Sequence, residues 1–388
     1  MLPAAQSAKS RANADSRRSA LAARSPGVEG LTTTARGAEI VLTLKPLAGE
    51  GILETFGRLA AALKELEATL AHLMVFGSVK ASAAGTEAMR RIFSGIDWPV
   101  TWVEGAACDG GPIAGMHAFA FAGSAMKRIV QDGRIVGSIV EDGATRQCLL
   151  GGMVPGRKDT SRSEQTLETI RNIGNALAQA GFSWSDVVRT WFYLDDLLHW
   201  YGEFNRVRTQ AYAQIQFCTG SSPASTGVSA RNPAGAALVA GVRAVQPLDS
   251  AVSIEEVASP LQCPAPAYGS AFSRAMEIAS PAGRHLLISG TASIAPDGRV
   301  LWRGDVRRQV AWTVEVVAAI LQSRGFAFSD ITRATTYFKN CAQARAFTEW
   351  CAARDLTCLP VVTAQCDICR DELLFEVEAD AWQPNHVD

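Results

Sequence analysis

The chain has 388 residues, and its 37 basic and 38 acidic side chains leave a net charge of −1. This balance argues against a nucleic-acid partner, whose phosphates need a basic surface, and no apolar run approaches the ~20 residues that span a membrane. Hydrophobic residues make up 48 % of the chain, enough for a large core in two or three domains, and nine Cys without a secretory signal predict reduced thiols in a cytoplasmic protein.

Residues 1–37 are predicted to form a disordered tail. The segment is rich in Ala, Ser and Arg and contains almost no large apolar side chains. A secretory signal needs a continuous apolar stretch of roughly 7–15 residues, which this segment lacks. Such a composition buries too little apolar surface to offset the entropy lost on folding.

The rest of the chain contains an internal repeat. Residues 165–196 align without a gap with residues 309–340, and the alignment matches Gly181 with Gly325. In each copy, apolar side chains at helical spacing predict a helix. The matched Gly stands just past the last turn, where a left-handed residue commonly closes a helix.

Each copy continues with the same order of elements. The β-branched and aromatic runs at 187–194 and 331–338 predict strands. A second helical stretch follows in each copy, at 200–214 and at 341–354, and then two strands, the first of which begins at a Pro.

A third, diverged copy is predicted upstream, and each copy is expected to open with a hairpin such as 284–298. The units are placed at 38–125, 126–250 and 251–383. Each predicted unit has a mixed sheet with both helices on one face, and its other face must be covered. We therefore expect an α+β fold in which three tandem units close into a pseudo-trimer within a monomeric chain.

Four strings give the sequence a family resemblance. They are "YGEFNRVR" at 201–208, "FSRAMEI" at 272–278, "LISGTASI" at 287–294 and "DICRDELLFEVEA" at 367–379. The element order resembles the RidA/YjgF superfamily, whose chorismate mutase-like units usually form homotrimers. Three fused copies with these strings resemble the chorismatases, most closely the 3-hydroxybenzoate synthase type. The fused cyanuric acid hydrolase and barbiturase group fits less well, because no repeated Ser/Lys pair is present.

The resemblance implies a cleavage of chorismate to pyruvate and a ring acid. Protonating the methylene carbon of its enol ether needs a carboxylic acid that stays protonated near neutral pH. Glu376, on an apolar strand in repeat three, is the candidate acid. Glu378 is the competing choice, because strand alternation puts both side chains on the same face. Cys369 is expected to border the pocket and to shape the product.

Further candidates would bind the substrate. Guanidinium groups bind carboxylates bidentately, so the substrate-binding arginines are predicted to be Arg208, Arg274 and Arg370. The aligned Tyr193 and Tyr337 are either core residues or pocket hydroxyls. Around the Gly of "SGTAS", hydroxyls and backbone amides could hold a carboxylate, and the candidates there are Ser289 and Thr291.

Two segments depart from the chorismatase pattern in the region where a dicarboxylate would be held. The segment "AYGSAFSRA" at 267–275 is short and lacks an extra Arg, and "APDG" at 295–298 replaces a polar loop. Two alternatives stay open: a RidA-like imine hydrolase and a non-catalytic protein that binds a small molecule. Imine hydrolysis needs an Arg in the Pro-started strands, where the alignment has Thr101, Ser225 and Val362. No cofactor is implied, and the lone Cys366–Cys369 pair lacks the further ligands of a metal site.

Overall fold

The computed structural model describes residues 29–105 and 107–385. Most of the predicted tail, residues 1–28, lies outside the described residues. The predicted end of the tail at residue 37 is wrong, because residues 31–36 form strand β1, which pairs antiparallel with β2. The sequence LTTTAR is short and polar, but its Thr residues favour a strand once β2 offers a partner.

The first repeat has a five-stranded sheet in the order β1-β2-β5-β3-β4. Two helices and five strands make up the repeat: β1 (Leu31–Arg36), β2 (Glu39–Leu44), α2 (Ile52–Glu65), β3 (Ala68–Gly77), α3 (Ser82–Phe93), β4 (Val100–Val103) and β5 (Ile113–Ala122).

The second repeat has a six-stranded sheet in the order β10-β9-β11-β8-β7-β6. Its elements are β6 (Met126–Gln131), β7 (Arg134–Glu141), β8 (Thr145–Met153), α4 (Arg162–Gln179), β9 (Val187–Leu194), α5 (Tyr201–Tyr212), β10 (Ala224–Ser229) and β11 (Leu238–Pro247).

The third repeat has the matching order β12-β13-β14-β17-β15-β16. Its elements are β12 (Ser253–Val257), β13 (Ala275–Ser280), β14 (Gly283–Ala292), α6 (Val306–Ser323), β15 (Ile331–Phe338), α7 (Arg345–Ala352), β16 (Val361–Gln365) and β17 (Phe375–Pro384). Gly181 and Gly325 have φ of +72° and +75°, so the helix ends predicted at these positions are confirmed.

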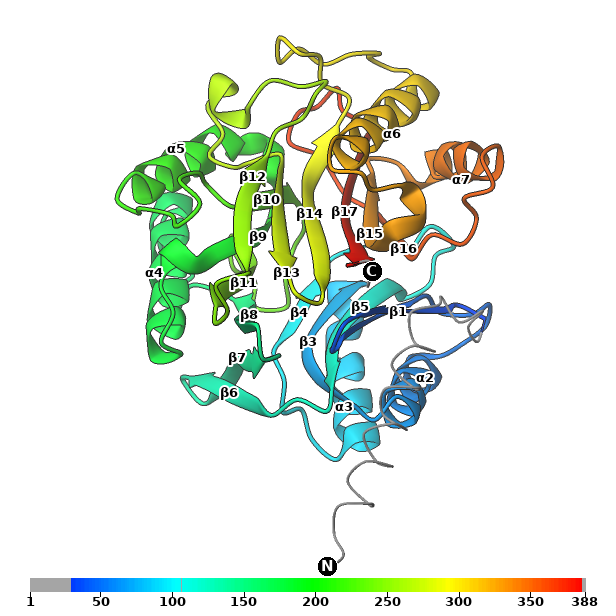
Figure 1. The fold of residues 1–388 in the computed structure, drawn as a ribbon. Helices are drawn as coiled ribbons and strands as arrows, with labels where there is room; N and C mark the ends of the chain where they lie inside the picture. Colours follow the sequence, from blue (N-terminus) through cyan, green and yellow to red (C-terminus); the bar gives the residue numbers. More distant parts are fainter. Residues whose placement is uncertain (1–28, 106, 386–388) are drawn as a thin grey trace, which may run out of the picture.

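The three sheets surround a common centre, and the helices lie on the outside (Figure 1). At the centre the Phe76 ring lies 6.1 Å from the rings of both Tyr193 and Tyr337. Each of these residues comes from the corresponding strand of its repeat, β3, β9 or β15. The prediction of three α+β units arranged as a pseudo-trimer is therefore confirmed.

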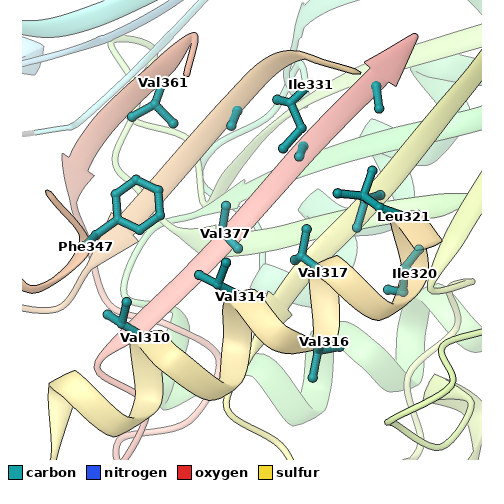
Figure 2. Packing of buried hydrophobic residues seen from close by; sticks show 14 of the residues in the cluster. Val310, Val314, Val316, Val317, Ile320, Leu321, Ile331, Phe347, Val361 and Val377 are labelled. Atoms are coloured by element: carbon teal, nitrogen blue, oxygen red, sulfur yellow. The ribbon is translucent and has the colours of Figure 1, made fainter. Parts of the chain in front are cut away.

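Each repeat has its own core between its helices and the outer face of its sheet. In the third repeat, Val310, Val314 and Val317 of α6 face β17 and its Val377 (Figure 2). The spacing of these valines follows the helical period, which explains why the sequence predicted this helix from its apolar stripe. The inner face of each sheet is left for contacts between repeats.

Two local expectations were wrong. The predicted hairpin at 284–298 is one long strand, β14, followed by a turn that a bridge between Ile294 and Val300 closes. The hairpin itself turns earlier, between β13 and β14. The cysteines are also not all reduced, since Cys108 and Cys341 form a disulfide. Repeats one and three meet there, with the two Cα atoms 5.0 Å apart, a proximity that the sequence does not reveal.

None of the helices in the described residues has the length and apolarity needed to cross a lipid bilayer.

Candidate active site between repeats two and three

A cavity of about 150 Å³ lies where repeat two meets repeat three. Repeat two contributes α5 and β10, and repeat three contributes β14, the end of β17 and the loops at 268–274 and 369–370. Five of the predicted site residues line this cavity: Arg208, Arg274, Cys369, Arg370 and Glu376.

Glu376 is buried in this cavity, with 4 % of its surface exposed. Within the described residues its carboxyl group forms no hydrogen bond and no ion pair. Burial raises the pKa of Glu376 to about 8, and the charge of Glu378 adds to this rise, against the opposing effects of Arg189 and Arg274. Glu376 is therefore a protonated carboxylic acid at neutral pH.

Gly290 of β14 makes room for this acid. A Cβ atom at position 290 would collide with Oε1 of Glu376. The absence of a side chain at Gly290 allows the Glu376 carboxyl to lie against the β14 backbone. The "SGTAS" string therefore contributes to the site through its glycine.

Glu378, the competing candidate, has the opposite environment. Its Oε2 accepts hydrogen bonds from Arg189 (2.6 Å), Trp191 (3.0 Å) and Thr226, and its Oε1 accepts one from Arg333 (2.7 Å). Burial alone would raise its pKa, but Arg333 and Arg189 hold the pKa of Glu378 below its ordinary value. Glu378 is thus an ionised structural residue, whereas Glu376 keeps its proton.

Three arginines surround the cavity without acidic partners. Arg208 and Arg274 are 1 % and 3 % exposed, and Arg370 is half-buried. Among the residues that the structure describes, none of the three forms an ion pair. Arg208 donates to Asn205 (2.7 Å), Arg274 to the carbonyl of Cys263 (2.8 Å) and Arg370 to the carbonyl of Gly298 (2.6 Å). Buried unpaired cations are costly, so this arrangement favours an anionic ligand.

Cys369 and Tyr201 complete the wall beside Glu376. Burial, together with the charge of Glu376, raises the pKa of the Cys369 thiol to about 12. Burial also raises the pKa of Tyr201 to about 12. Both groups keep their protons at neutral pH, so Cys369 shapes the pocket as a neutral thiol and Tyr201 can donate a hydrogen bond.

Four predicted substrate-binding residues lie elsewhere. Tyr193 and Tyr337 pack with Phe76 at the centre of the molecule, where burial raises both pKa values. Ser289 donates to the carbonyl of Ser273 (2.5 Å) and accepts from the backbone amide of Ser225 (2.8 Å).

The hydroxyl of Thr291 donates to the carbonyl of Ser289 (2.9 Å). Strand alternation predicts which face of the sheet each of these four residues lies on. It does not predict whether a residue on that face borders the cavity or the central axis. The hydroxyl groups of Ser289 and Thr291 bond to backbone groups, those of Tyr193 and Tyr337 are buried without a hydrogen-bond partner in the described residues, and none of the four residues lines the cavity.

The sequence prediction missed other lining residues, among them Tyr201, Asn205 and Tyr268. Tyr201, Asn205 and Arg208 lie on one face of α5, at positions i, i+4 and i+7. That spacing within the string "YGEFNRVR" could have identified them. Tyr268 lies in a 3₁₀ turn of the altered loop, where no periodicity points to it.

The corresponding clefts between the other repeats lack this acid. Glu376 pairs with Tyr337, and in the same register Val239 pairs with Tyr193 and Gly115 with Phe76. The cleft of repeats one and two, about 250 Å³, therefore has Val239 where the candidate site has Glu376.

The Pro-started strands also carry no arginine at the position that imine hydrolysis needs. The register places Thr226 of β10 opposite Trp191, as it places Val362 opposite Thr335 and Thr101 opposite Met74. The alignment that used Ser225 was therefore displaced by one residue. Neither Thr nor Val can bind a carboxylate as a guanidinium does.

A model of the family described as Endoribonuclease L-PSP, also known as RidA/YjgF, matches residues 144–259 and 264–383, more than half of the sequence. The chain belongs to this family. Among solved structures, the RidA/YjgF chain resembles a chorismatase at a TM-score of 0.61 and 19 % identity, covering 89 % of this chain and 99 % of the other. At this identity the likeness establishes a shared fold.

A putative endoribonuclease from Thermotoga maritima matches at a TM-score of 0.28 and 18 % identity, covering 34 % of this chain and 98 % of its own. No protein of curated function matches the sequence.

Proposed function

We propose that this RidA/YjgF protein is a chorismatase-like enzyme that cleaves the enolpyruvyl ether of chorismate or a close relative. One observation carries the proposal: a single cavity contains the protonated Glu376 together with arginines that have no acidic partner in the described part of the chain. The arginines favour a ligand that carries negative charge. The protonated carboxyl group favours a ligand that accepts a proton. A ligand that suits the whole cavity therefore has both properties. Chorismate has both an enol ether and two carboxylates.

Glu376 acts as the general acid in this mechanism. It donates its proton to the methylene carbon of the enol ether, and the positive charge of the resulting oxocarbenium ion resides on the neighbouring carbon and the ether oxygen. Addition of water then gives a hemiketal, which collapses to pyruvate and a dihydroxy-diene acid. If the ring also eliminates its free hydroxyl group together with a ring hydrogen as water, it becomes aromatic. The water released then equals the water added, and the products are pyruvate and 3-hydroxybenzoate.

Cys369 is proposed to influence which ring product forms. It lines the cavity next to Glu376 and Tyr201, and its high pKa keeps it neutral. A neutral thiol does not attack the oxocarbenium ion as a thiolate would, so the role of Cys369 is to set the shape of the cavity around the ring.

A cytoplasmic location stays a prediction.

The decisive experiment is to incubate the purified protein with chorismate and to measure pyruvate with lactate dehydrogenase and NADH. Liquid chromatography of the same mixture identifies the ring acid. Catalytic formation of pyruvate supports the proposal. Tight binding of chorismate without pyruvate would instead indicate a protein that only binds the ligand, and ammonia release from a 2-imino acid would indicate the RidA-like imine hydrolase.

A further inference from the structure

Two aromatic rings in the loop before β13 connect the three arginines of the cavity. Phe272 contacts both Arg208 and Arg274, whose guanidinium carbons lie 5.9 and 5.6 Å from its ring centroid. Tyr268 contacts both Arg274 and Arg370, each at 5.3 Å. Cations and rings therefore alternate along one wall of the cavity. We call this series of five side chains the arginine ladder.

The ladder differs from the buried arginines at the centre of the molecule. There, Arg333 forms ion pairs with Glu378 and Asp380, so carboxylates offset its charge. In the ladder, the negative faces of Tyr268 and Phe272 take the place of carboxylates. Aromatic faces attract guanidinium groups without occupying all of their in-plane N–H donors.

The donors that remain are those a carboxylate would use. Arg274 donates to the carbonyl of Cys263 through Nε and Nη2, and Arg370 donates to the carbonyl of Gly298 through Nη1. Nη1 of Arg274, and Nε and Nη2 of Arg370, donate to no residue that the structure describes. Each arginine is thus held by a backbone carbonyl and a ring while part of its donor edge stays free.

Both segments that depart from the chorismatase pattern take part in the ladder. Tyr268 and Phe272 belong to the short segment at 267–275, and Gly298 belongs to the "APDG" turn. Gly298 has φ of +84°, and a Cβ atom there would lie 3.7 Å from the Tyr268 ring. The turn therefore lies beside the ring of Tyr268, and its carbonyl at Gly298 holds Arg370.

We propose that Tyr268 and Phe272 are positioning residues, which hold three guanidinium groups without acidic partners and thereby make the cavity select ligands with two carboxylates over ligands with one. The inference rests on the proposed function only for the identity of the natural dicarboxylate. The rings act through their faces, so the hydroxyl group of Tyr268 is dispensable. A substitution that removes a ring lets the cations separate and weakens the second carboxylate contact.

Titration calorimetry with two probes tests this proposal. The probes are 3-(carboxymethoxy)benzoate, with two carboxylates, and 3-methoxybenzoate, with one. We expect the wild type and Tyr268→Phe to bind the dicarboxylate at least about tenfold more tightly, and Tyr268→Leu and Phe272→Leu to lose about tenfold of that preference. Trp302→Leu is the matched control, because it removes a surface contact with Arg308 of the same type, at 5.0 Å, and leaves the preference unchanged.

Three results would overturn the inference: equal affinity of the wild type for the two probes, loss of the preference in Tyr268→Phe, or a full preference in both folded Leu variants. Circular dichroism verifies the fold of each variant, and Phe272→Leu serves if Tyr268→Leu does not fold. A dicarboxylate preference without pyruvate formation from chorismate supports the ladder and overturns the proposed function. Pyruvate formation with equal affinity for both probes does the reverse.

Discussion

Glu376 and Glu378 lie two residues apart on β17, on the same face of the same sheet, and both are buried. Glu378 accepts hydrogen bonds from Arg189 and Arg333 and is ionised. Among residues 29–105 and 107–385 Glu376 has no such partner, and burial raises its pKa to about 8. Burial alone would keep both carboxyl groups protonated, so the difference shows that the arginines decide which group ionises.

The arginines divide in the same way. At the centre, Arg333 is paired with Glu378 and Asp380. Arg333 also lies over aromatic rings, so rings alone do not separate the two regions. In the candidate site, Arg208 and Arg274 are equally buried but have no carboxylate partner among the described residues, and they donate to the side chain of Asn205 and the carbonyl of Cys263. Together these two regions separate a structural ion-pair network from a site that is arranged for an external anion.

The substitution Glu376→Gln should have the largest effect, which is a loss of catalytic activity. Removing the proton donor should lower kcat on chorismate by about 10²–10⁴-fold, while circular dichroism shows an unchanged fold. Pyruvate formation is measured with the lactate dehydrogenase assay. Glu256→Gln, which changes an exposed glutamate on β12 of the same repeat, is the control and should keep full activity. A fully active Glu376→Gln variant would exclude Glu376 as the acid.

Glu378→Gln should act on stability. The substitution leaves Arg189 and Arg333 without their shared carboxylate, and breaking a buried ion pair costs about 3–5 kcal/mol. Urea unfolding followed by fluorescence should show a lower free energy of unfolding by that amount. The comparison fails if Glu376→Gln destabilises the chain as much as Glu378→Gln does.

Arg208→Met tests whether the arginines of the cavity bind the substrate and do not stabilise the fold. Because Arg208 has no acidic partner within the described chain, we expect its replacement by an apolar side chain of similar size to leave the free energy of unfolding unchanged or raised. It should raise KM for chorismate by about 10–100-fold. Arg333→Met, at the centre, should instead unfold at clearly lower urea concentration. Equal destabilisation by the two variants would contradict the division between the regions.

The smallest expected effect is the change of kcat/KM with pH. Since Glu376 must be protonated, kcat/KM should fall about tenfold per unit above pH 8. The pKa is higher in the folded chain than the 4.5 of an ordinary glutamate. The stability that Glu376 contributes is therefore full below pH 4.5 and is lost as the pH rises through about 8.

Glu376→Gln should accordingly gain stability relative to the wild type as the pH increases across this range. Chemical unfolding of both proteins at several pH values measures the difference. A constant difference from pH 4.5 to 8 would show that the pKa of Glu376 is not raised.

The fold could be predicted from the sequence because self-similarity and apolar periodicity are local signals, and the aligned helices ending at Gly181 and Gly325 are examples. Strand β1 was missed, since its polar run becomes a strand only through pairing with β2. For the site, the matched strings named Glu376 and three arginines, and these four residues line one cavity. Alternation could not separate Tyr193 or Ser289 from them, because the inner face of each sheet borders both the central axis and a cleft.

The most direct test of the central claim is a ¹³C NMR titration of protein labelled at the glutamate carboxyl carbons. In the wild type we predict one carboxyl resonance that titrates near pH 8, and its absence from the Glu376→Gln spectrum. The Glu378 resonance, identified by its loss in Glu378→Gln, should stay in the ionised form down to pH values below 4.5. A Glu376 resonance that titrates near 4.5, or a resonance near 8 that persists in Glu376→Gln, would contradict the account.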